Sequence, residues 1–253
     1  GVQTVGGAFL YDADSLIIRR PLRIHCGFSQ LATLTYVAAR DQWLTAGNGQ
    51  LCAFSISDRL HAPGEDAPSP ALPIEPLPID LAVTRLVSSS LADGPGRAVF
   101  DHARRFLYAT GMEAGKPVLE IVDLASNALV YRGNIASNLF TSAIAVSDDG
   151  TRVYLLQSGS ETPATTATSV VVFDASARVF LPALPVPNSL LALPGSTSEP
   201  FAHSMQMIPS NRLLITSGGG SYSQLGPVVA LDVLTGSATR IAGGQAKFRV
   251  MAQ

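Results

Sequence analysis

Histidine is the side chain most often used to bind a metal ion or to transfer a proton, and this sequence holds four histidines. The strand pattern described below places His25, His61 and His203 near one face of the fold, and it places His102 in a turn at the other end. No two of them have the spacing of metal ligands on a helix or a hairpin. We therefore expect ordinary exposed or core-edge histidines, with no metal and no cofactor.

Aspartate recurs at one position of a repeated pattern, at Asp12, Asp123, Asp174 and Asp232. A ring of carboxylates facing a channel could supply the acid and the base of a glycosidase. An aspartate just before a turn, however, accepts hydrogen bonds from the backbone N–H groups of that turn. We interpret all four as structural turn residues, and the strands expected to line the channel contain no Asp or Glu.

Two arginines, Arg97 and Arg249, fall on strands that are expected to be innermost. They could line a central channel and attract an anionic ligand, or buried carboxylates could neutralise them. Both interpretations remain open at this point.

Familiar enzyme motifs are missing. The sequence has no GxSxG nucleophile turn, no HExxH zinc motif and no CxxCH haem motif. Whether the chain is an enzyme is therefore uncertain, and the sequence favours binding over catalysis.

Cys26 and Cys52 are the only cysteines. Without a CxxC spacing they make a poor metal or redox site, so one disulfide or two buried thiols remain. A bridge would contribute roughly 3 kcal/mol by closing a loop, and it would point to an oxidising compartment.

The composition is that of a folded domain. Hydrophobic residues make up 47% of the 253 residues and charged residues 14%. The 17 basic residues are scattered and the net charge is −2, so the clustered basic face of a nucleic-acid-binding protein is missing. No apolar run approaches the about 18 to 20 residues of a membrane span.

Four segments share one layout of strands and turns. In the clearest copy, a strand at 142–146 is followed by the turn Ser147-Asp148-Asp149-Gly150, a strand at 153–156 and a strand at 170–174. Similar copies begin near residues 98, 205 and, more faintly, 34, and a more exposed fourth strand follows, as at 128–132 and 237–241. Four antiparallel strands per repeat is the composition of a β-propeller blade.

The two ends of the chain supply parts of one further blade. Residues 2–5, 9–12 and 16–20 have the pattern of second, third and fourth strands, and residues 248–252 have that of a first strand. Joining them closes a ring and removes its exposed edges. The sequence thus predicts one all-β domain over residues 1–253, a β-propeller of about five four-stranded blades closed by N- and C-terminal strands. The alternative is a fragment of a propeller of about six to eight blades.

The segments IVDLASN (121–127) and SDDGTRVYL (147–155) resemble the YVTN-type β-propeller repeats of bacterial proteins. At the level of the repeat, the resemblance covers most of the chain. It implies a propeller fold and an exported binding or scaffolding role, in the periplasm or outside the cell. The same family includes lactonases and relatives of dehydrogenases, so the resemblance does not fix an activity.

Strand order predicts which connections share a face. The second-to-third connections and the blade-to-blade connections should emerge at one end, here called the long-loop face, and the other turns at the opposite end, the short-turn face. The irregular stretches that this pattern assigns to the long-loop face are 61–96, 111–117, 157–169, 181–200 and 218–227. The Pro-rich stretch at about 61–80 is interpreted as an insertion, and residues 80–91 as a short helix or a strand laid on the ring.

Loops on a rigid scaffold commonly carry function, so the long-loop face is the candidate binding site. Its candidate ligand-binding residues are His25, His61, Glu113, Glu161, His203 and Tyr222. The leading hypothesis is an exported, non-catalytic propeller that binds a protein or a saccharide there. The alternatives are a propeller hydrolase or lactonase with catalytic groups on its loops, and a structural subunit of a larger surface assembly.

Overall fold

The computed structural model describes residues 8–11, 18–24, 33–37, 40–47, 50–55, 79–81, 84–86, 97–101, 103, 105–136, 140–158, 168–192, 201–218 and 225–242. These residues form β-sheets, apart from their turns and one helical turn, α2 (Asn188–Leu191). The helices among them include none long and apolar enough to cross a membrane.

Four antiparallel sheets of four strands follow one another along the chain, and we call them blades B to E. Blade B consists of β3 (Thr33–Val37), β4 (Gln42–Gly47), β5 (Gln50–Phe54) and β7 (Thr84–Arg85). Blade C consists of β8 (Ala98–Phe100), β9 (Phe106–Glu113), β10 (Lys116–Asp123) and β11 (Ala128–Asn134). Blade D consists of β12 (Phe140–Val146), β13 (Arg152–Ser158), β14 (Ser169–Asp174) and β15 (Val179–Pro185). Blade E consists of β16 (Phe201–Ile208), β17 (Arg212–Gly218), β18 (Leu225–Asp232) and β19 (Ala238–Ala242).

A fifth sheet, blade A, contains β1 (Ala8–Tyr11), β2 (Ile18–Ile24) and β6 (Ile79–Leu81). Strands β1 and β2 pair antiparallel, as expected for the third and fourth strands of the N-terminal blade. Strand β6 adds to β2 in the parallel direction, which the repeat did not predict. Parallel neighbours need a long crossover, and three strands of blade B lie in sequence between these two.

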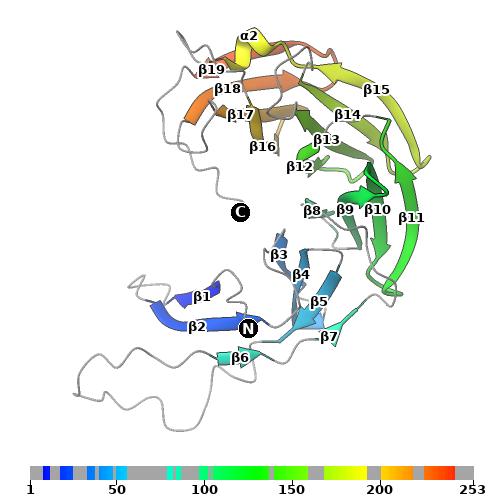
Figure 1. Ribbon diagram of the computed structural model, residues 1–253, viewed down its shortest axis with the longest axis vertical. Coiled ribbons are helices and arrows are strands. Elements are labelled where there is room, and N and C mark those ends of the chain that lie inside the picture. The colour runs from blue at the N-terminus through cyan, green and yellow to red at the C-terminus, as the bar shows by residue number, and fades with distance from the viewer. Residues whose placement is uncertain are drawn as a thin grey trace.

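The blades are arranged around a central opening (Figure 1), with the first strand of each blade from B to E nearest to it: β3, β8, β12 and β16. The fourth strands β7, β11, β15 and β19 lie at the outside. The predicted fold class, an all-β propeller of about five blades, is confirmed. The predicted closing segments 2–5 and 248–252 lie outside the described residues.

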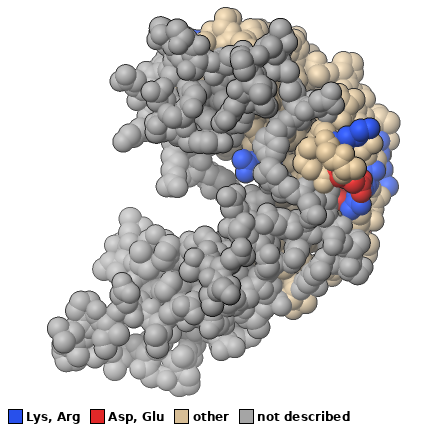
Figure 2. Space-filling view, in the orientation of Figure 1, with Lys and Arg blue, Asp and Glu red and all other residues tan. Residues whose placement is uncertain are grey.

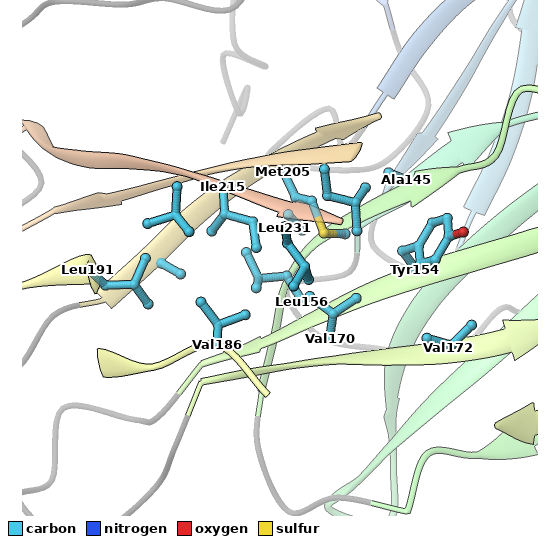
Figure 3. Close-up of a cluster of buried hydrophobic side chains, with 14 residues drawn as sticks. Ala145, Tyr154, Leu156, Val170, Val172, Val186, Leu191, Met205, Ile215 and Leu231 are labelled. Carbon is cyan, nitrogen blue, oxygen red and sulfur yellow. The ribbon is translucent and has the colours of Figure 1, made fainter. Parts of the chain in front are cut away.

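The core lies between the faces of neighbouring blades. One cluster fills the space between blades D and E (Figure 3) and includes Leu156, Met205 and Ile215. Another, between blades C and D, includes Tyr108 and Leu155. Leu155 and Leu156 are both 0% exposed, because β13 is covered on each of its two faces. A strand buried on both faces reads as a continuous apolar run, which is what residues 153–156 show.

Two loop boundaries differ from the sequence expectation. The stretch 111–117 is no long loop, because β9 and β10 continue to a two-residue turn at Ala114 and Gly115, with φ of 48° and 77°. Positive φ at both positions suits the twist of a hairpin. The stretch 181–200 begins inside β15, and α2 follows that strand.

The outer strand of blade B also differs. The sequence pattern assigned residues 61–96 to the long-loop face. In the structure the fourth strand is β7 (Thr84–Arg85), so the segment leaves β5 at the short-turn end of the blade. The region predicted as a helix or a strand laid on the ring supplies strands, β7 and part of β6.

Candidate binding face

The two ends of the blades differ in their hydrogen bonding. At the short-turn face, the turns of blades C to E between third and fourth strands are held by one aspartate each. Asp174 Oδ1 accepts hydrogen bonds from the N–H groups of Ser176 (2.9 Å) and Ala177 (2.8 Å). Asp232 Oδ1 accepts equivalent bonds from Leu234 and Thr235, both at 2.9 Å.

These bonds lower the pKa of Asp174 and of Asp232. The backbone N–H of Ala177 is the main cause that lowers the pKa of Asp174, and that of Thr235 is the main cause for Asp232. Asp123 Oδ1 accepts a hydrogen bond from Ala125 N at 2.7 Å. All three carboxylates therefore cap turns. Asp12 lies outside the described residues.

The turns between first and second strands, on the same face, are also closed by side chains. Asp101 Oδ1 accepts hydrogen bonds from the N–H groups of Arg105 (2.6 Å) and Phe106 (3.1 Å). In blade D, Asp149 Oδ1 accepts bonds from the hydroxyl of Ser147 (2.6 Å) and from Thr151. The Ser147 bond is the main cause that lowers the pKa of Asp149 to about 2.

The long-loop face is different, because polar side chains are buried between blades C and D there. In this space, Tyr108 and Leu155 form the apolar part nearer the short-turn face. Two residues further along the same strands, on the same face, Thr110 of β9 and Gln157 of β13 lie at the long-loop end. Both side chains are buried. Gln157 is paired with Thr141 of β12, and its Nε2 donates to Thr141 Oγ1 at 2.6 Å.

Arg97 connects blades C and D at the same end. It directly precedes β8, and its backbone N–H donates to Thr110 Oγ1 at 3.1 Å. Its Nε donates to the carbonyl oxygen of Ser142 on β12 at 2.8 Å. We call Arg97, Thr110, Thr141, Ser142 and Gln157 the polar layer.

One polar atom of the polar layer and one of a neighbouring residue have no hydrogen-bond partner among the described residues. Gln157 is 0% exposed, yet its Oε1 has no hydrogen-bond partner, and neither has the hydroxyl of the buried neighbour Ser158. Within the described ranges, no carboxylate pairs with Arg97, so buried neutralisation, one of the two interpretations of this arginine, is not seen there. Its Nη atoms donate to none of the described residues.

A second group of polar contacts at this face holds the connection from blade D to blade E. Ser217, at the end of β17, is buried and donates through Oγ to Leu191 O at 2.7 Å. The guanidinium of Arg240 donates to three carbonyl oxygens of the same connection, those of Leu190 (3.0 Å), Ser189 (2.8 Å) and Ala192 (2.8 Å). The helical turn α2 is thereby fixed on blade E.

Among the described residues, charged side chains gather on the outer part of blade C (Figure 2). Glu120 and Arg132 are paired across β10 and β11, and Arg132 Nη2 lies 2.6 Å from Glu120 Oε1. Arg132 Nη1 also lies 3.0 Å from Oε1 of Glu113 at the hairpin end. Because Glu120 is 1% exposed, this arginine compensates a buried charge.

The structure describes few of the candidate residues predicted from the sequence. Glu113 lies on the long-loop face and is engaged by Arg132. His203 lies on β16, and only its backbone is described. The candidates that fall outside the described residues are His25, His61, Glu161, Tyr222 and Arg249.

Cys52 lies on β5, is 2% exposed and is disulfide-bonded. Cys26, the only other cysteine of the sequence, lies outside the described residues. The Cys26–Cys52 pairing therefore stays a prediction. Among the residues whose positions are described, no group of three or more His, Cys, Asp and Glu side chains could hold a metal ion.

No protein-family model and no curated protein matches the chain. Its fold is similar to Kuenenia stuttgartiensis hydrazine synthase, with a TM-score of 0.59 and 8% identity over 92% of this chain and 59% of that chain. It is also similar to a chain of the nidogen/laminin complex, with a TM-score of 0.53 and 8% identity over 90% of this chain and 68% of that one. A luciferin-regenerating enzyme aligns with a TM-score of 0.49 and 10% identity over 88% and 65%.

These similarities concern the fold. The neighbours are propeller-type structures, in agreement with the blades described above. The chain spans 59% of the length of the hydrazine synthase chain. At 8% identity, the similarity supports a shared fold and does not transfer the activities or partners of those proteins to this chain.

Proposed function

We propose that this protein is a non-catalytic binding propeller that holds a protein or saccharide ligand on its long-loop face. The observation that carries the proposal is the difference between the two faces. At the short-turn face, the carboxylates of Asp101, Asp149, Asp174 and Asp232 cap turns. Among the described residues, two of the three buried polar atoms without a hydrogen-bond partner, Gln157 Oε1 and Ser158 Oγ, lie at the long-loop end, and the third is Gln206 Oε1 on β16. Leaving a buried polar atom unpaired costs about 1–3 kcal/mol unless a water molecule or a ligand bonds to it.

An exported bacterial protein, in the periplasm or outside the cell, is part of the proposal. The disulfide of Cys52 supports it, because disulfides persist in oxidising compartments. The likeness of residues 121–127 and 147–155 to YVTN-type repeats supports it as well.

A binding role also fits the way propellers present ligand sites. The strands near the opening are rigidly packed between neighbouring blades, and connections at one end are free to vary. The nidogen/laminin complex contains a chain of similar fold within a protein–protein complex, which is compatible with the protein class of partner.

The proposal is tested by screening the labelled chain against a glycan array and a panel of lactones, followed by a steric test on any ligand found. A bulky maleimide polymer is attached to a Lys116→Cys variant, at the exposed hairpin of the long-loop face. The matched control carries the same polymer on Ser176→Cys, in an exposed turn of the short-turn face.

We expect the polymer at position 116 to weaken ligand binding at least about tenfold and the polymer at position 176 to leave it unchanged. A ligand blocked only from position 176 would overturn the proposed face. Turnover of a lactone would instead favour the hydrolase alternative.

A further inference from the structure

We propose that residues 79–86 act as a releasable strap between blades A and B. When the strap detaches from β5, blade A opens with it and the disulfide of Cys52 becomes accessible, while blades C to E stay folded. The inference goes beyond the proposed function, because it concerns how one end of the fold opens and not what the long-loop face binds.

The strap contributes a strand to each of two neighbouring sheets. Its first part, β6, pairs in parallel with β2 at the edge of blade A. Three residues after Leu81, Thr84 begins β7, which pairs antiparallel with β5 at the edge of blade B (Figure 1). Three residues of backbone span at most about 11 Å. One short piece of chain therefore crosses from the edge of one sheet to the edge of the next.

The hold of the strap on blade B is small. Strand β7 has two residues, whereas the fourth strands β11 and β15 have seven each. Its contacts with β5 include two residue pairs and a hydrogen bond from Leu86 N to Leu51 O at 2.9 Å. Thr84 is exposed, and Leu86 is half-buried against the core cluster between blades B and C. Segments with few buried contacts open locally at a lower free energy than a packed sheet does.

Cys52 lies next to this contact, because it is the residue of β5 that pairs with Arg85 of the strap. Cys52 is 2% exposed and disulfide-bonded, so a reducing thiol reaches its sulfur only after part of the fold has opened. Its predicted partner, Cys26, follows β2 by two residues in the sequence, so the predicted bridge would join the same two blades as the strap. The rate of reduction therefore reports how often this end of the fold opens.

The test measures how fast dithiothreitol reduces the disulfide of Cys52 in the native protein. The wild type is compared with Leu86→Ala, which removes the half-buried side chain of the strap. Leu129→Ala is the matched control, because Leu129 of β11 is half-buried against the same core cluster and lies outside the strap. Native-state hydrogen exchange at the Leu86 amide and along β10 is measured in parallel, at rising urea concentrations.

We expect Leu86→Ala to speed the reduction by about tenfold and Leu129→Ala to leave its rate within about twofold of the wild type. In the wild type, the Leu86 amide should exchange faster than the amides of β10. Its exchange should also depend less on urea, because release of the strap exposes less surface than unfolding of the whole chain.

Equal acceleration by the two variants would show that reduction requires unfolding of the whole chain, and it would overturn the inference. Exchange at Leu86 with the rate and urea dependence of the β10 amides would overturn it as well. If Leu86→Ala does not fold, the exchange measurement on the wild type decides between the two outcomes by itself.

Discussion

At the scale of single residues, the carboxylate of Asp149 closes the first turn of blade D. It accepts hydrogen bonds from two hydroxyls and one backbone N–H, at 2.6 to 2.9 Å. These bonds favour the ionised form, which is why the pKa of Asp149 falls to about 2.

Replacing this carboxylate, by Asp149→Ala, should lower the stability at pH 7 by about 1 kcal/mol, or about 2–4 °C in Tm. Because the pKa of Asp149 is lower in the folded state, its stabilisation is complete above the unfolded value of 3.8 and is lost as the pH falls toward about 2. Denaturant unfolding at pH 7, 4 and 2.5 measures this. A difference between variant and wild type that stays constant over that range would contradict the explanation.

The turns capped by Asp123, Asp174 and Asp232, and the position of Arg97 directly before the innermost strand β8, could be predicted from the sequence, because each follows from a local pattern or from the strand order. Gln157 could not. Residues 153–156 are apolar without alternation, so nothing in the sequence tells which neighbouring blade the next side chain faces. The only local signal was the change from apolar residues to the polar pair Gln157-Ser158. That change does not show that Gln157 lies near Arg97, because Arg97 belongs to the preceding blade.

At the scale of elements, Arg240 fixes α2 through three carbonyl oxygens. We expect Arg240→Met to lower stability by about 2 kcal/mol, since three hydrogen bonds from a charged group to backbone carbonyls are lost. Arg178→Met is the control, because Arg178 donates a single bond, to Val130 O. The backbone N–H of Ala192 donates to Asn188 O at the end of α2, so its amide hydrogen should exchange faster in the Arg240→Met variant. Unchanged exchange would show that other contacts hold α2.

The packing between blades D and E gives a second prediction at this scale. Leu156→Ala should cost about 2–5 kcal/mol, because the side chain is 0% exposed and the space cannot close around a smaller residue. Val179→Ala, at a residue 47% exposed on β15, should cost less than about 1 kcal/mol. Equal losses of stability, measured by urea unfolding, would contradict the assignment of the core to the faces between blades.

The strands of blades C, D and E could be predicted because each has three to eight residues with an apolar pattern and a turn signal. The fourth strand of blade B could not, since β7 has two residues and no periodicity. The parallel pairing of β6 with β2 depends on contacts between distant segments, which a local pattern does not contain.

At the scale of the whole molecule, the disulfide of Cys52 bears on where the protein works. The predicted pairing with Cys26 means that the denatured, unreduced protein should contain no reactive thiol. Titration with a thiol reagent under denaturing conditions, before and after reduction, measures this. Two reactive thiols before reduction would show that the two cysteines are not bridged, and an exported location would then lose this support.

The central claim concerns which end of the blades meets the ligand. Hydrogen exchange of the whole chain, with and without the ligand found by the array, tests it most directly. Protection is expected at residues 110–117, 140–142 and 157–158 of the long-loop face, with little change in the turns at 147–151, 174–178 and 232–237. Protection confined to those turns would contradict the account.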